Sequence, residues 1–148
     1  MEDNWSSFLS YWQNTGLHFL PIHDGEDTEI QKAAAENNLK VTTINMQRVI
    51  RKQTFLRKMA KGLEFPAHFG YNWDALFDCL TDLSLSGADG HVILIYNLQL
   101  LESKAPADFK IIRKVFETAA DYWHSHQMRF FIIISEKSSL SNKVPNDR

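Results

Sequence analysis

Two nearly continuous apolar runs constrain the fold of this chain more than any other feature. One run is HVILIY, residues 91–96, and the other is RFFIIIS, residues 129–135. A strand with one face in water alternates apolar and polar side chains, and neither run does so. Each is therefore predicted to be a strand buried on both faces, as in a parallel sheet covered by helices.

Helical patterns separate these two strands from two shorter ones. Residues 17–22 and 41–44 are short apolar runs that are predicted to be further strands. Thr28 is expected to cap a helix that runs to about residue 37. Apolar side chains recur at helical spacing in four other segments, which are residues 5–12, 55–63, 72–83 and 106–123. The fold class is therefore α/β, with a small, mostly parallel β-sheet and right-handed crossovers.

Length and composition exclude several classes of protein. The 148 residues, 44% of them hydrophobic, fit one globular domain. The only cysteine, Cys79, rules out an internal disulfide and a cysteine-rich metal site. The N-terminus lacks the basic and apolar regions of a secretory signal, and no run approaches the ~20 apolar residues of a membrane span. We therefore expect a cytoplasmic protein with no membrane partner and no cofactor.

Charge divides the chain into a basic and an acidic part. Between Glu36 and Glu64 there are seven Lys and Arg residues and no acid. Between Lys61 and Lys104 there are six Asp and Glu residues and no base. Because the net charge is only −2, the distribution carries more information than the total. Such asymmetry points to charged partners.

A row of carboxylates marks the helix that Asn72 is predicted to cap and that runs to about Leu83. At ~100° per residue the apolar side chains form one continuous arc, and Asp74, Asp78 and Asp82 fall on the opposite side. Two Asp residues four positions apart repel by roughly 0.2–0.5 kcal/mol, and the helix contains no Lys or Arg to offset this. An uncompensated cost is expected at functional sites, although acidic, solvated helix faces are also common.

Aromatic residues lie beside these acids in the sequence. His68, Phe69, Tyr71, Trp73 and Phe77 surround or enter the acidic helix, after a loop that contains Pro66 and Gly70. Aromatic anchors next to charges are typical of a protein–protein hot spot. The segment is therefore interpreted as a surface that binds another protein.

The segment FPAHFGYNWDALFDCLTDL, residues 65–83, resembles the signature of the barstar family, the intracellular inhibitors of secreted bacterial ribonucleases. The order of the neighbouring elements is also similar, and the resemblance covers about residues 41–135. In that family the helix and its preceding loop plug the active site of the ribonuclease. Its carboxylates take the positions of substrate phosphates, facing Arg, Lys and His of the enzyme.

The resemblance implies a partner-binding surface with Asp74 and Asp78 as its central charges. The other residues expected in this surface are His68, Asn72, Trp73, Phe77, Thr81 and Asp82. The sequence departs from the best-known member at four positions. His68 replaces a tyrosine, Phe77 and Leu83 replace tryptophans, and Thr118 aligns with an acid. These departures concern the identity of the target.

Three parts are expected along the chain. Residues 41–135 are predicted to form the barstar-like domain, with three core strands. Residues 1–40 are predicted to pack on this domain as an extension that adds a helix, an edge strand and another helix. The polar residues 136–148 are predicted to be a flexible tail.

Other residues with reactive side chains are interpreted as structural. Cys79 is expected to be a packed cysteine, because neighbouring acids raise a thiol pKa. His124 and His126 are expected to be a solvent-facing pair at a helix end, where the helix dipole favours positive charge. No catalytic residue and no metal ligand is therefore assigned.

Two function hypotheses follow from the sequence. The first is a stoichiometric inhibitor, an immunity protein or antitoxin, that occludes the cationic active site of a ribonuclease or related nuclease toxin. In this hypothesis the bacterial protein is not an enzyme, is a monomer when free, and binds no nucleic acid. The alternative is a small regulatory protein that binds nucleic acid through the basic segment 48–61.

Overall fold

The four strands form one parallel sheet. The computed structural model describes residues 3–136. Its strands are β1 (Gly16–Leu20), β2 (Lys40–Asn45), β3 (Gly90–Tyr96) and β4 (Arg129–Ser135). They lie in the order β1-β4-β3-β2, and every neighbouring pair is parallel. The predicted α/β class and the parallel sheet are confirmed.

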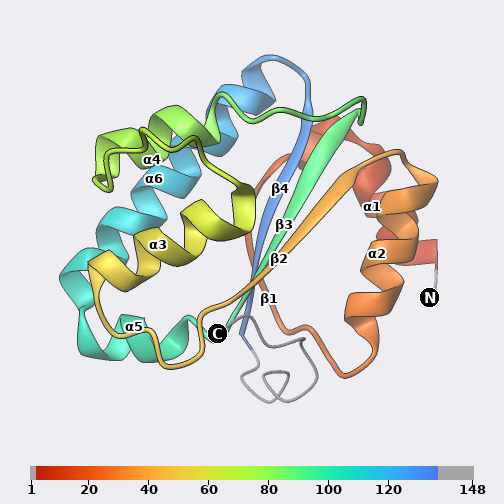
Figure 1. Cartoon of the computed structure of the whole chain (residues 1–148). Helices are drawn as coiled ribbons and strands as arrows, with labels where there is room; N and C mark the ends of the chain where they lie inside the picture. The colour runs from red at the N-terminus through yellow and green to blue at the C-terminus, as the bar shows by residue number, and fades with distance from the viewer. Residues whose placement is uncertain (1–2, 137–148) are drawn as a thin grey trace.

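The two apolar runs form the central strands of the sheet (Figure 1). Every residue of β3 is buried, and so is every residue of β4 except Arg129. Successive side chains of a strand point to opposite faces, so a strand covered on both faces is apolar throughout. The edge strands β1 and β2 are less buried, which agrees with their shorter apolar runs.

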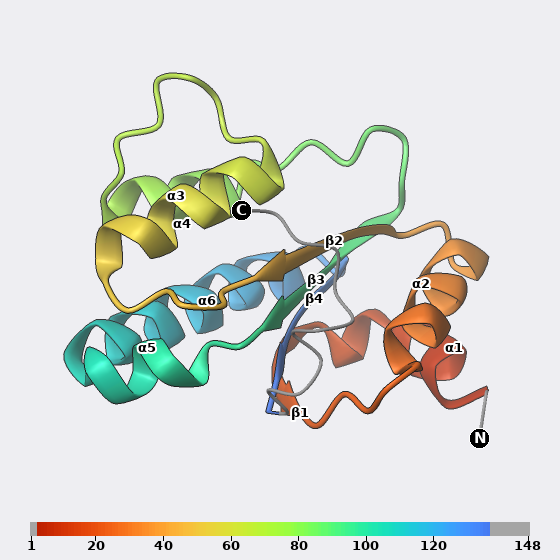
Figure 2. The same cartoon turned by 60° about the horizontal axis from the view of Figure 1, so that its bottom comes forward.

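Helices cover both faces of the sheet (Figure 2). On one face lie α1 (Asp3–Ser10) and α2 (Glu26–Glu36), and the short 3-10 helix η1 (Trp12–Asn14) follows α1. The other face carries α3 (Lys52–Leu63), α4 (Trp73–Leu80), α5 (Gln99–Lys104) and α6 (Pro106–Ser125). The sheet therefore separates two cores. Among the β3 side chains, Ile93 and Ile95 enter the core under α3–α6, whereas Val92 and Leu94 enter the core under α1 and α2.

The prediction for the start of α2 was wrong. The helix begins at Glu26, two residues before Thr28, and Gly25 occupies the position that Thr28 was expected to take. Gly25 has a φ of 90°, which glycine adopts without a steric penalty. The carboxylate of Glu26 accepts a hydrogen bond from the backbone N–H of His23 at 2.8 Å and so ties the preceding turn to the helix.

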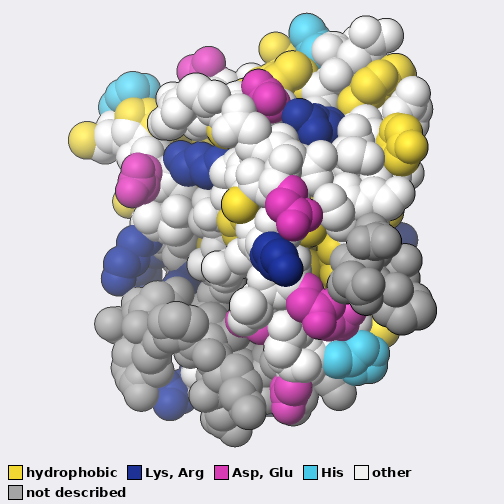
Figure 3. Space-filling model, turned by 90° about the vertical axis from the view of Figure 1, so that its right-hand side faces the viewer, with side chains coloured by type: hydrophobic (Ala, Val, Ile, Leu, Met, Phe, Trp, Pro, Cys, Tyr) yellow, Lys and Arg dark blue, Asp and Glu magenta, His cyan; other side chains and the backbone are white. Residues whose placement is uncertain are grey.

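Residues before Lys40 contribute α1, η1, β1 and α2. Strand β1 pairs with β4 at the edge opposite β2, so the N-terminal residues add the predicted edge strand to the three core strands. The side of the molecule that carries α1 and α2 shows acidic, basic and histidine side chains interspersed, with no single-sign patch outside the grey atoms (Figure 3).

No helix among residues 3–136 has the length and apolar character to cross a membrane. The predicted flexible tail lies outside the described residues from residue 137 onward.

Candidate functional site

Helix α4 turns an apolar side to the core and an acidic side to water. Leu76 and Leu80 are completely buried in the core under α3–α6. Phe77 is partly buried against the same core, whereas Asp74 and Asp78 are exposed. The helix is therefore held by its apolar side chains, and its carboxylates take no part in packing.

Asn72 fixes the start of α4. Its backbone is extended, and its Oδ1 accepts a hydrogen bond from the N–H of Ala75 at 2.8 Å. Its Nδ2 donates to the carbonyl oxygen of Gly70 at 3.3 Å, which joins the cap to the preceding loop. Since an N-cap satisfies an otherwise unpaired N–H, Asn72 sets the position at which the acidic side begins. The predicted cap at Asn72 is confirmed.

The end of α4 differs from the prediction. The helix stops at Leu80, not near Leu83, and the hydroxyl of Thr81 donates to the carbonyl oxygen of Phe77 at 2.9 Å. The indole Nε1 of Trp123, in α6, donates to the carbonyl oxygen of Leu80 at 2.9 Å. These two bonds satisfy carbonyls at the helix end and fasten it to α6. Asp82 consequently lies in the turn after the helix, where it is exposed.

A cluster of three aromatic rings lies in the loop between α3 and α4. The ring of Phe69 lies 4.9 Å from that of Phe65 and 4.7 Å from that of Tyr71, between ring centroids. Phe69 is 6% exposed, whereas His68 is exposed and Tyr71 is 42% exposed. The buried ring therefore anchors a loop that presents His68 on one side and Tyr71 on the other.

Trp73 is partly buried and packs against the core beneath the site. Its ring lies 6.2 Å from that of Phe55, and the Lys52 ammonium lies 5.2 Å from its centroid. A cation over an indole face is attracted by the ring quadrupole. Lys52 thus links the basic helix α3 to the start of α4.

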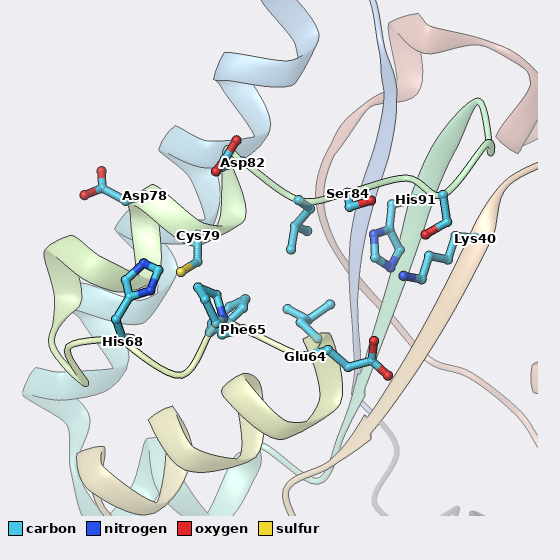
Figure 4. Close-up of a pocket in the computed structure, with 13 residues that line it drawn as sticks. Lys40, Glu64, Phe65, His68, Asp78, Cys79, Asp82, Ser84 and His91 are labelled. Atoms are coloured by element: carbon cyan, nitrogen blue, oxygen red, sulfur yellow. The ribbon is translucent and has the colours of Figure 1, made fainter.

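A hollow of about 460 Å³ lies beside α4, and we call it the acidic hollow (Figure 4). His68, Asp78 and Asp82 line it from the α4 side. Glu64 lines it from the end of α3, and Lys40 and His91 line it from β2 and β3. Its carboxylates outnumber its one lysine, so it suits a cationic group at the α4 end.

His91 lies at the inner end of the acidic hollow (Figure 4). The residue is 1% exposed, and its Nε2 lies 2.8 Å from the hydroxyl oxygen of Thr42. The buried Nδ1 has no hydrogen-bond partner among residues 3–136. Burial, and secondarily the positive charge of Lys40, lowers the pKa of His91 from 6.5 to about 4. The ring is therefore neutral at pH 7.

Cys79 also lines the acidic hollow. Burial raises the pKa of its thiol above the usual 9.0, and the negative charges of Asp78 and Asp82 raise it further. The thiol stays protonated at neutral pH, and a protonated thiol is a poor nucleophile. The structure therefore gives Cys79 no feature of a catalytic cysteine.

The two histidines near the end of α6 have local partners. His126 Nδ1 lies 2.8 Å from the carbonyl oxygen of Tyr122, and the ring of His124 lies 5.0 Å from that of Trp12. Within the part of the chain that the structure describes, no group of three His, Cys, Asp or Glu side chains could hold a metal ion.

The structure brings together only part of the predicted surface. His68, Asp78 and Asp82 share the acidic hollow. Asp74 is exposed outside it, and four other predicted residues hold the helix or pack against the core: Asn72, Trp73, Phe77 and Thr81. Glu64 and His91 were not predicted. Glu64 was visible only as one acid in the charge count, and His91 begins an apolar run, so neither carried a local signal.

Thr118 supplies no charge where the resemblance placed an acid. It is exposed on α6, and its hydroxyl donates to the carbonyl oxygen of Lys114 at 2.8 Å. The adjacent Glu117 lies 3.2 Å from Nε of Arg113 in an exposed ion pair. Among the positions at which the resemblance led us to expect an acid, only those on α4 and in the turn that follows it carry one.

The fold and the site define a parallel α/β protein that presents exposed carboxylates on one capped helix. The family model described as Barstar (barnase inhibitor) matches residues 39–135. The match includes α4 and more than half of the chain, so this protein belongs to the barstar family. No curated protein matches the chain.

A solved structure described as "Structure of Drosophila ORC bound to DNA" contains a chain of similar fold. The TM-score is 0.60, and the sequence identity is 11%. The alignment covers 98% of this protein but 38% of the other chain. At this identity the similarity concerns the fold alone.

Proposed function

We propose that this protein is a stoichiometric inhibitor of a ribonuclease or a related basic nuclease toxin. The exposed carboxylates of Asp74 and Asp78, on a helix inside the family match, carry the proposal. They would enter the cationic active site of the nuclease and occupy the positions of substrate phosphates. Inhibition would be by occlusion, with no bond made or broken.

The geometry of α4 supports this mode of binding. The helix is capped by Asn72 at one end and tied to α6 by Trp123 at the other, so the carboxylates are held before the partner arrives. A preorganised surface loses less conformational entropy on binding. The acidic hollow would take one cationic side chain of the nuclease, between Asp78 and Asp82.

The protein would act in the bacterial cytoplasm as an immunity protein or antitoxin, and it would be a monomer when free. The expected contact surface includes His68, Asn72, Trp73, Phe77 and Thr81 around the carboxylates. The unusual His68 and Thr118 would adapt it to a target different from that of other family members.

Replacement of Asp78 by alanine tests the proposal. The variant is titrated against barnase and a panel of secreted bacterial ribonucleases, and RNA cleavage and complex formation are measured. We expect one ribonuclease to be inhibited at a 1:1 ratio by the natural chain. Loss of the Asp78 charge should weaken that complex by about 2–5 kcal/mol, a general range to which barnase and its inhibitor themselves contribute.

Glu36→Ala is the matched control, because Glu36 is an exposed acid at the end of α2 on the other side of the sheet. It should leave inhibition unchanged. Asp78→Ala also removes the repulsion from Asp74, so the free energy of unfolding should stay the same or rise by about 0.2–0.5 kcal/mol. If Asp78→Ala inhibits as tightly as the natural chain, the assigned surface is wrong.

A further inference from the structure

A second hollow, of about 630 Å³, lies between α3 and the loop that precedes α4. We call it the basic groove. Four cations from two segments line it: Arg48, Arg57, Lys58 and Lys61. No Asp or Glu lines it, and neither Arg48 nor Arg57 forms an ion pair with any residue that the structure describes. The groove therefore attracts an anion.

The arrangement of the cations follows from the helix geometry. Arg57 and Lys58 follow Thr54 by three and four residues, and Lys61 follows them by four and three, so the four side chains share one side of α3. Arg51 and Lys52 do not line the groove, although they belong to the same basic segment. Only part of the basic segment 48–61 therefore lines the basic groove.

The rest of the lining is apolar and aromatic. Val49 contributes from the segment before α3, and Phe65, Pro66 and Tyr71 contribute from the loop after it. Tyr71 is 42% exposed, and its ring packs against the buried Phe69. A carboxylate of an acidic peptide would need only the cations. A ligand that has both a phosphate and a planar ring would use the whole lining.

Two residues that line the groove have a left-handed backbone. Arg48 has a φ of 67° and Tyr71 a φ of 52°, which non-glycine residues adopt at an energetic cost. The turn at Arg48 is held by the Val49 N–H, which donates to the carbonyl oxygen of Met46 at 3.0 Å. It is also held by Asn45 Oδ1, which accepts from the Gln47 N–H at 3.0 Å. Strain maintained in this way is typical of a preorganised binding site.

We propose that the basic groove binds a phosphorylated nucleoside. The phosphate lies between Arg48 and Arg57, and the base lies against Tyr71. A volume of about 630 Å³ is within the usual range of roughly 300–1,000 Å³ for small-ligand sites. Free nucleotide and a nucleotide of single-stranded RNA share this chemistry. The acids of α4 begin three residues after Tyr71 and repel further phosphates on that side.

Fluorescence anisotropy of a short, labelled oligouridine measures the binding at low salt. Arg48→Ala/Arg57→Ala should weaken it about tenfold or more and flatten its salt dependence. Lys110→Ala/Lys114→Ala removes the same charge from exposed positions of α6 and should leave the binding within about twofold. Tyr71→Ala should weaken it by roughly fivefold to a hundredfold, and Tyr71→Phe should restore it, because the ring supplies the stacking face.

Competition identifies the source of the ligand. UMP and AMP should displace the oligouridine, and ribose 5-phosphate, which lacks a base, should do so more weakly. Equal affinity for UMP and the oligonucleotide supports a free nucleotide, and tighter binding of the oligonucleotide supports RNA.

Four results would overturn the proposal: no binding at low salt, equal competition by inorganic phosphate or polyglutamate, an equal loss in the α6 control, or no loss in Tyr71→Ala. Because no ribonuclease is present in this assay, its outcome is separate from the test of the inhibitor function.

Discussion

His91 shows at the residue scale how one buried side chain couples folding to pH. Its folded pKa of about 4 lies below the usual 6.5. Above pH 6.5 the ring is neutral in both the folded and the unfolded state, so the contribution of His91 to folding stability does not change with pH. Between pH 6.5 and 4 the unfolded state binds a proton that the folded state does not bind. Folding stability therefore falls across this window.

The expected loss is about 3 kcal/mol, since each pKa unit corresponds to about 1.4 kcal/mol. Urea unfolding at several pH values between about 7 and 4 measures it. The variant His91→Gln should lose this part of the pH dependence, whereas His23→Gln, at an exposed position, should keep it. An identical pH profile for His91→Gln and the natural chain would contradict the assignment.

The carboxylates and the histidine also differ in how far the sequence could predict them. Helical periodicity alone placed Asp74 and Asp78 on the solvent side of α4, because one period governs the whole helix. His91 and Glu64 come to line the same hollow as Asp78 only in the folded chain, from β3 and the end of α3. Contacts between distant elements leave no periodic trace in the sequence, so the inner part of the acidic hollow was not predictable.

On the scale of a single element, helix α4 depends on its N-cap, Asn72. Asn72→Ala leaves the N–H of Ala75 without its side-chain acceptor. We expect the free energy of unfolding to fall by about 0.5–2 kcal/mol. Asn72→Asp should retain most of the stability, because its carboxylate accepts the same bond and favours the helix N-terminus. Urea unfolding of both variants is the measurement, and an alanine variant as stable as the natural chain would show that the cap is dispensable.

The boundaries of elements were predictable where a side chain acts on its own neighbours. Asn72 identified the start of α4 in this way, and Pro106 marked the start of α6. The six-residue α5 is too short to show a period, and it was missed. The end of α4 depends on Trp123, 43 residues from Leu80, so it was placed three residues too late.

On the scale of the whole molecule, the sheet depends on the residues before position 39, where the family match begins. Val92, Leu94, Phe131 and Ile133 are at most 1% exposed in the core under α1 and α2. A chain of residues 39–148 would expose these four side chains to water. Each contributes about 1.5–3 kcal/mol when buried, and a whole domain is stable by only about 5–15 kcal/mol.

We therefore expect the shortened chain to unfold or aggregate, although it contains the complete family match. Circular dichroism and size-exclusion chromatography, with the full chain as the control, measure this. A shortened chain that is monomeric and unfolds cooperatively would show that residues 1–38 only decorate an independent domain.

The pairing of β1 with β4 has a consequence for how the protein is made. The hydroxyl oxygen of Thr15, just before β1, accepts a hydrogen bond from the N–H of Phe130, 115 residues later. A ribosome adds Phe130 only 115 residues after Thr15, so β1 waits for β4 before it can pair. Contacts of such long range slow folding. Each new copy thus carries β1 without its partner strand until β4 has been synthesised, and a chain stopped before β4 cannot complete the sheet.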